Sequence, residues 1–456
     1  MSNNPKTKQS ITLFLFSTAS ILLVLFLCDS ALAFRTTPKV KCIIETDRAI
    51  LPAGDVQNAI IKITLDAPPA PVNSPRPPVN LSIVLDRSGS MSGTKIERAK
   101  EAAIEALKRL SEKDIFSLVV YDHAVNTIIP AQRAVNTEMM INKIRAIRSG
   151  GSTALFGGVS QGAAEIRKYI EGNFVHRIIL LSDGLANVGP DTPADLGRLG
   201  AALIKENISV TTIGVGTDYN EDLMARLSQK SDGNIYFVES SYDLPKIFTA
   251  ELGDVLNVVA KKVKIIIEVP EGIYPVSIIG REGRIKDNKI EISMNQLYGD
   301  QEKYALVEIK IPKSKSGQKM ELANAKVHYE NPFTKRNEIS TGRSFAKFSD
   351  DIKKVEKSAN VNVVREYELN LNALAEEKAI TLSDKGKRKE AVQILKQSAA
   401  KLKSAGSLYK DERLLEEAEQ LETQADMIAK EGMSKKSRKI LRTKSYQKKN
   451  QQMKKY

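Results

Sequence analysis

The feature that most constrains the fold is an alternation of short apolar runs with amphipathic helical patterns between residues 81 and 253. Residues 81–85 (LSIVL) form an apolar run with the length of a buried strand, and residues 94–110 follow with apolar side chains at helical spacing. Strands alternating with helices imply right-handed crossovers, so we predict a doubly wound, mainly parallel sheet of the α/β class. The remaining strand patterns are at 115–121, 175–181, 208–215 and 234–238, and the helical patterns are at 137–147, 155–170, 194–206, 221–231 and 243–253.

Strand patterns without helices flank this region on both sides. Residues 34–66 contain strand-like patches, and residues 256–345 return to β-branched, alternating sequence. Six prolines between residues 67 and 78 mark a stiff connection. The first segment is too short to bury a sheet face alone. We therefore expect residues 34–78 and 256–345 to build one β-sandwich into which an α/β domain, residues 79–255, is inserted.

The C-terminal part is helical and then strongly basic. Residues 355–430 predict a helical region with helices at 361–381, 387–404 and 410–429, and Gly386 and Gly406 act as breaks. The last segment, residues 431–456, has ten Lys and Arg against one Glu and few large apolar residues. This composition predicts a flexible basic tail.

The N-terminus has the pattern of a targeting segment. Two lysines precede 17 uncharged residues, 11–27, and small residues lie at both ends of Ala31-Leu32-Ala33. Residues 1–33 therefore predict a signal peptide cleaved after Ala33, and with it an exported protein in the periplasm, at the cell surface or outside the cell. The alternative is an uncleaved helix that anchors the chain, because 17 residues is just within spanning range. A lipid attached at Cys28 is disfavoured because the preceding Leu27 is large.

The residues that point to chemistry begin where the first predicted strand ends, at Asp86-Arg87-Ser88-Gly89-Ser90. Asp86, Ser88 and Ser90 alternate along a turn, so their oxygens can converge on one point. Hydroxyl and carboxylate oxygens form a hard ligand set that suits Mg²⁺. The alternative is an Asp and Ser turn that only caps the next helix.

Two further oxygens are predicted near the same edge of the sheet, where doubly wound folds bind ligands. Gly150-Gly151-Ser152-Thr153 is a flexible loop before a helix, and Asp183 ends the strand pattern 178–183. Thr153 is favoured over Ser152 for the loop ligand. A helix cap does not account for Thr153 and Asp183, so the metal interpretation is preferred.

These five residues resemble the metal-ion-dependent adhesion site of the von Willebrand factor A domain, whose pattern is Asp-x-Ser-x-Ser, a distant Thr and a distant Asp. The metal set by this resemblance is Asp86, Ser88, Ser90, Thr153 and Asp183, and the likeness covers residues 80–253. It implies that both serines bind the cation directly, that Thr153 and Asp183 act directly or through water, and that one position is left for a partner's acidic side chain. The wider layout resembles secreted bacterial proteins labelled calcium-activated chloride channel homologues.

The predicted function is a metal-dependent protein-binding, adhesion or assembly module in the cell envelope or outside the cell. Mg²⁺ is the expected cation, with Mn²⁺ or Ca²⁺ as alternatives. Only two carboxylates serve the metal, so it stays electrophilic toward a carboxylate on the partner. A cytosolic role beside an ATPase is disfavoured by the signal peptide. The channel label is not carried over, because the sequence contains no pore-forming spans.

No enzyme is expected. Gly158-Val159-Ser160-Gln161-Gly162 matches G-x-S-x-G, but it lies inside a predicted helix instead of between a strand and a helix, as a nucleophile elbow requires. Its glycines are better explained by close helix–sheet packing. Gly214-Val215-Gly216 lacks the third glycine of a dinucleotide loop. With two Cys and three His, a zinc framework is also not expected.

Charge suggests an alternative partner. The chain carries 69 Lys and Arg against 55 Asp and Glu, a net charge of +14, and ten basic residues against one acidic residue place +9 of this after residue 430. The alternative function is therefore a scaffold on an anionic surface or membrane that binds through the tail. Its affinity would fall with salt and be insensitive to EDTA. No specific nucleic-acid partner is expected, and the oligomeric state is left open.

Overall fold

The computed structural model describes residue 1, residues 39–72 and residues 74–454. Apart from residue 1, the predicted signal peptide or anchor, residues 1–33, lies outside the described residues together with Cys28. Among the residues described, no helix has both the length and the apolar character needed to cross a membrane.

The α/β region is built on a six-stranded sheet in the order β6-β5-β4-β7-β8-β9. All neighbouring pairs are parallel except β5 and β6, which are antiparallel. The doubly wound prediction is confirmed, whereas the edge strand β6 was not predicted. The elements are β4 (Val79–Asp86), α2 (Thr94–Lys108), β5 (Ile115–Tyr121), β6 (Val125–Arg133), α3 (Thr137–Arg145), α4 (Leu155–Arg167), β7 (Val175–Ser182), α5 (Pro193–Lys205), β8 (Ile208–Val215), α6 (Glu221–Ser231), β9 (Ile235–Val238) and α7 (Leu244–Val255), with short 3₁₀ turns at Gly89–Met91 and Ser241–Asp243.

Successive side chains of each strand point to opposite faces of this sheet, so a separate hydrophobic core forms on each face. On β4, Leu81, Ile83 and Leu85 join the core that α2, α3 and α7 cover, whereas Val84 faces α4, α5 and α6. Every residue of β4 is buried, as expected for a central strand covered on both faces.

The glycines of the G-x-S-x-G match lie where helix α4 touches the sheet. A Cβ on Gly158 would lie 2.6 Å from the ring of Tyr121, and one on Gly162 would lie 2.5 Å from a methyl group of Val84. The packing interpretation of these glycines is therefore confirmed, because a larger residue at either position would have to displace a side chain of the sheet.

Two further sheets contain strands from both sides of the α/β region in the sequence. Their orders are β1-β3-β14-β11, with β17 beside β14, and β12-β13-β10-β15-β16-β2. Strand β3 pairs with β14 along its whole length, and residues of β3, β10, β14 and β15 share one hydrophobic core. The strands are β1 (Lys41–Thr46), β2 (Ile50–Pro52), β3 (Gln57–Asp66), β10 (Val258–Glu268), β11 (Tyr274–Ile279), β12 (Arg284–Lys286), β13 (Lys289–Tyr298), β14 (Gln301–Ile311), β15 (Lys319–Asn331), β16 (Arg336–Ser349) and β17 (Gln452–Lys454).

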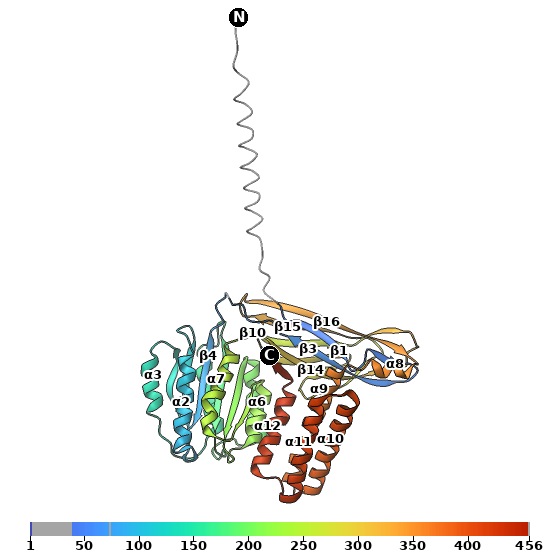
Figure 1. Ribbon diagram of the computed structural model, residues 1–456. Coiled ribbons are helices and arrows are strands. Elements are labelled where there is room, and N and C mark those ends of the chain that lie inside the picture. The colour runs from blue at the N-terminus through green and yellow to red at the C-terminus, as the bar shows by residue number, and fades with distance from the viewer. Residues whose placement is uncertain (2–38, 73, 455–456) are drawn as a thin grey trace. The chain divides into compact units, whose positions relative to one another are not determined.

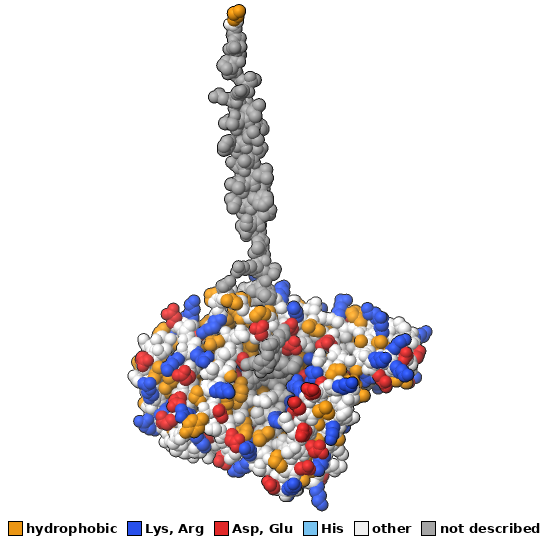
Figure 2. All heavy atoms as spheres, in the orientation of Figure 1, with side chains coloured by type: hydrophobic (Ala, Val, Ile, Leu, Met, Phe, Trp, Pro, Cys, Tyr) orange, Lys and Arg blue, Asp and Glu red, His pale blue; other side chains and the backbone are white. Residues whose placement is uncertain are grey.

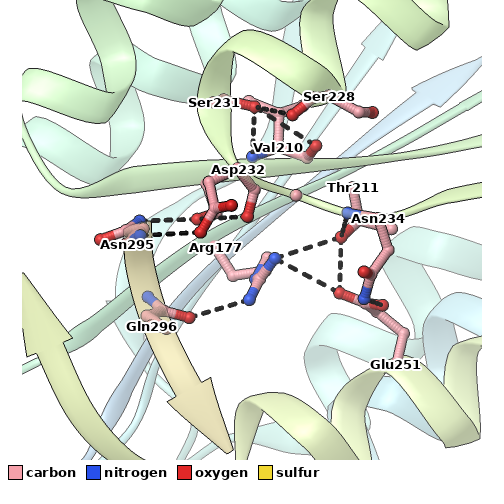
Figure 3. Close-up of polar contacts among 12 residues, drawn as sticks. Arg177, Val210, Thr211, Ser228, Ser231, Asp232, Asn234, Glu251, Asn295 and Gln296 are labelled. Carbon is pink, nitrogen blue, oxygen red and sulfur yellow. Dashed lines mark hydrogen bonds and ion pairs between the residues drawn. The ribbon is translucent and has the colours of Figure 1, made fainter. Parts of the chain in front are cut away.

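A buried polar network joins the α/β region to strand β13 (Figure 3). Arg177 of β7 is fully buried and donates to Gln296 at 2.8 Å and to the hydroxyl of Tyr298 at 2.5 Å. Its guanidinium also lies 3.5 Å from the carboxylate of Glu251 in α7. Because buried polar groups without partners are costly, these bonds tie the two regions into one orientation.

The predicted C-terminal helical region is confirmed. It contains α8 (Ile352–Lys357), α9 (Val361–Asp384), α10 (Arg388–Tyr409) and α11 (Glu412–Glu431). Residues from α9, α10, α11 and the next helix, α12 (Lys435–Lys449), share a core of Leu and Ala side chains. The four helices lie side by side in Figure 1, and α12 lies next to α6.

The predicted flexible basic tail, residues 431–456, is wrong. Residues 435–449 are helical, and β17 pairs with β14. Seven basic residues of this segment form ion pairs with acidic groups on other elements. The ammonium of Lys439, for example, lies 2.7 Å from the carboxylate of Glu221, and both side chains are buried. On the face drawn in Figure 2, basic and acidic side chains are interspersed.

Candidate metal-binding site

Neighbouring parallel strands bring the predicted residues to one edge of the sheet. Strand β4 ends at Asp86 and its neighbour β7 ends at Ser182, just before Asp183. The loop before α4 is attached to the same edge, because the amide of Gly89 donates to the carbonyl of Gly151 at 3.0 Å. The three predicted segments are therefore adjacent.

Three hydroxyl oxygens and one carboxylate converge at this edge. The Oγ atoms of Ser88 and Ser90 are 3.0 Å apart, and Ser90 donates to Oδ1 of Asp183 at 2.7 Å. A Cβ placed on Gly184 would lie 3.1 Å from Oγ1 of Thr153, 3.3 Å from Oγ of Ser90 and 3.6 Å from Oγ of Ser88. These oxygens therefore surround the space above Gly184, and that space exists because residue 184 lacks a side chain.

Asp86 lies behind these hydroxyls and is fully buried. Its Oδ1 accepts a hydrogen bond from the amide of Ser88 at 2.8 Å, and its Oδ2 accepts one from the hydroxyl of Ser182 at 2.7 Å. Burial raises the pKa of Asp86, and the carboxylate of Asp183 raises it further, whereas the bonds from Ser88 and Ser182 lower it. Two carboxylates held close together in a buried place favour a cation between or beside them.

The loop position is occupied by Thr153. Its side chain is buried at the site, whereas Ser152 is exposed. The amide of Thr153 donates to Oδ1 of Asn187 at 2.8 Å, and the amide of Asn187 donates back to the carbonyl of Thr153 at 3.1 Å. Asn187 therefore positions the hydroxyl of Thr153.

Sequence reasoning missed three residues that contact this group. Ser182 and Asn187 hold Asp86 and Thr153, and Lys95 of α2 forms an ion pair with Oδ2 of Asp183 at 2.5 Å. The position of Ser182, immediately before Asp183 at a strand end, was the one available signal. Nothing in the spacing of Lys95 or Asn187 indicates these contacts.

The donor set is composed of oxygen and fits a hard divalent cation. Hydroxyl and carboxylate oxygens are the ligands that Mg²⁺, Mn²⁺ and Ca²⁺ accept. Ser90 is exposed, so the group of oxygens can be reached from solvent. Within the described part of the chain, no group of three or more His, Cys, Asp or Glu side chains could hold a metal ion. The candidate metal site is the group of oxygens at Gly184, because three hydroxyls and a carboxylate meet there.

Comparisons with known proteins agree with this fold. Residues 80–250 match the von Willebrand factor type A domain family. An uncharacterized protein of Synechocystis sp., sll0103, is 27% identical over 271 residues, which are 56% of this chain and 63% of that protein. Rat inter-alpha-trypsin inhibitor heavy chain H3 is 24% identical over 241 residues, which are 49% of this chain and 27% of that protein.

A solved structure extends the likeness beyond the α/β region. The von Willebrand factor type A structure from Catenulispora acidiphila superposes with a TM-score of 0.67 at 17% identity and covers 83% of this chain and 90% of that chain. At this identity the likeness concerns the fold. Taken with the sheet order and the family match, it shows that residues 80–250 of this chain are a von Willebrand factor type A domain.

Proposed function

We propose that the domain is a metal-dependent protein-binding module whose adhesion site consists of Asp86, Ser88, Ser90, Thr153 and Asp183. The observation that carries this proposal is the convergence of three hydroxyls and the Asp183 carboxylate around Gly184. Mg²⁺ is the cation we propose, and Mn²⁺ or Ca²⁺ would suit the same oxygens. The partner is a protein that presents an acidic side chain.

The five residues would contribute different kinds of ligand to such a cation. Ser88, Ser90 and Thr153 offer neutral oxygens, and the two carboxylates supply negative charge. Asp86 is fixed by two hydrogen bonds, so it also keeps the turn in shape when a ligand arrives. A bound divalent cation supplies an electrophilic coordination position for a carboxylate oxygen. Neutral hydroxyls in place of further carboxylates leave that position attractive to an anion.

We also propose that the domain acts by binding and not by catalysis. Ser90 donates to Asp183, whose other oxygen pairs with Lys95, and we assign both residues to holding the cation. Export, which the N-terminal pattern indicates, would place the domain where protein partners in the envelope or outside the cell can reach it. We further propose that the two flanking sheets are one β-sandwich that presents the domain.

The anionic-surface alternative has lost its main support. It required free positive charges on a mobile tail, but seven of the eight basic residues of α12 are ion-paired, and the eighth, Lys444, donates to Gln420. The seven are Lys435, Lys436, Arg438, Lys439, Arg442, Lys448 and Lys449.

The proposal is tested by partner capture on the immobilised full chain. A partner captured in Mg²⁺ should elute with EDTA and bind again when excess Mg²⁺ is restored. Ser90→Ala should abolish capture, because it removes a hydroxyl of the cradle. Ser92→Ala is the matched control, since Ser92 is an exposed serine two residues away that bonds to Gly89 and Ser149. A partner that stays bound in EDTA refutes the metal bridge.

A further inference from the structure

Lys95 places a positive charge directly against the proposed metal site. It lies in the first turn of α2, and its ammonium is 2.5 Å from Oδ2 of Asp183 and 3.4 Å from the carbonyl of Ser90. The carboxylate of Asp183 is fully buried, whereas the side chain of Lys95 is 34% exposed. The two oxygens of Asp183 are therefore divided, since Oδ1 accepts from Ser90 and Oδ2 faces Lys95.

Lys95 changes the net charge of the site. Asp86 and Asp183 contribute two negative charges and Lys95 one positive charge, which leaves −1. The nearby Arg87 and Asp122 form their own ion pair at 3.0 Å and cancel each other. A divalent cation added to the group would leave +1 with Lys95 present and zero without it.

We propose that Lys95 is a built-in counter-charge that weakens divalent-cation binding and keeps net positive charge at the loaded site, which selects an anionic ligand. This inference rests on the proposed metal site and adds the residue that tunes it. Repulsion between the ammonium and the cation opposes loading. The same ammonium occupies one oxygen of Asp183, so that oxygen is not free to neutralise the cation.

A purely structural ion pair makes a different prediction. If Lys95 only stabilised the loop after β7, its removal would lower stability and would leave cation affinity equal or weaker. A counter-charge makes cation affinity rise when it is removed. Affinity for a metal ion therefore separates the two roles.

The test is Mn²⁺ binding to the full chain, followed by calorimetry or by the electron paramagnetic resonance of free Mn²⁺. Lys95→Gln should lower the dissociation constant at least about tenfold, because even in water a divalent and a monovalent charge a few ångströms apart repel strongly. Lys108→Gln removes the same charge from the other end of the same helix, where Lys108 is 55% exposed and pairs with Glu105. This control should stay within about twofold of the unmodified chain, because salt screens exposed distant charges.

The outcomes separate this inference from the proposed function. Mn²⁺ binding by the unmodified chain with unchanged or weaker binding by Lys95→Gln overturns the inference and leaves the metal site standing. Absence of binding in both chains overturns both. Lys95→Arg, which restores the charge, should return the affinity toward the original value. If Lys95→Gln does not fold, Lys95→Met removes the charge with a stem of similar length, and the same measurement decides.

Discussion

Removing the ammonium of Lys439 should weaken the attachment of helix α12 to the α/β domain. Lys439 and Glu221 are both buried, with side chains only 4% and 5% exposed, and their charged atoms are 2.7 Å apart. The Lys439 ammonium also lies 4.6 Å from the centre of the Tyr219 ring. Lys439→Met keeps most of the apolar stem and removes the charge, so it isolates the electrostatic contact.

The magnitude follows from the surroundings of Glu221. Leaving one partner of a buried ion pair uncompensated costs about 3–5 kcal/mol. Glu221 retains its ion pair with Arg438, so we expect the smaller cost of about 2 kcal/mol for opening of this helix. That free energy corresponds to an increase of about 30-fold in the exchange rate of protected amide hydrogens.

Hydrogen–deuterium exchange of peptides covering residues 435–449 measures this opening directly. Lys435→Met is the matched control, because Lys435 and its partner Asp218 are 73% and 65% exposed and solvent screens such a pair. The control should change exchange little. Unchanged exchange of α12 in Lys439→Met, or equal exchange in the two variants, would show that the buried ion pair does not hold this helix.

Three further predictions concern the site and the buried network. Gly184→Ala should weaken Mn²⁺ binding without loss of fold, because its Cβ would enter the cradle, whereas Gly150→Ala, which meets no atom within 4 Å, should not; a titration of both variants checks this. Burial lowers the pKa of His176 to about 4 from a usual 6.5, so only the unfolded chain takes up this proton between those pH values. The free energy of unfolding should therefore fall by up to about 1.4 kcal/mol per pH unit as pH drops through this window, and denaturation at several pH values should show a smaller slope for His176→Gln. Arg177→Met leaves Glu251 buried without its cation and should cost about 3–5 kcal/mol in urea unfolding; a loss below about 1 kcal/mol would contradict the role given to the network.

The spacing of apolar residues was sufficient to predict most strands and helices of the α/β domain. Strands β5 and β8 and helix α6 have the predicted bounds, because buried apolar runs and regular helical faces leave a clear pattern. Strand β6 escaped prediction because it is an edge strand in which only Ile129 is fully buried and Pro130 interrupts the pattern. Its signal therefore resembles a loop.

The amino-acid composition of the C-terminal segment led to a wrong prediction for a physical reason. A run of lysines and arginines predicts a solvated tail when its partners are unknown. Here the acidic partners Glu221 and Asp222 lie more than 200 residues earlier in the chain, so sequence proximity cannot reveal them. The apolar residues Leu441 and Tyr446, which are buried, were the signal that could have indicated a packed helix.

The residues of the candidate metal site that belong to a spaced sequence motif could be predicted from the sequence. Asp86, Ser88 and Ser90 lie on one turn, and strand order alone places Asp183 beside them. The contact of Lys95 with Asp183 spans 88 residues and arises from a lysine that the sequence shows as an ordinary surface residue of a helix. Such a contact needs the fold before it can be seen.

Saturable Mn²⁺ binding to the full chain is the measurement that decides whether the proposed metal site exists. We expect the unmodified chain to bind one Mn²⁺, which excess Mg²⁺ displaces. Binding should be lost in a Ser90→Ala, Thr153→Ala double variant and kept in Ser92→Ala. The absence of saturable binding in the unmodified chain, or equal binding by the double variant, would contradict the proposed metal site.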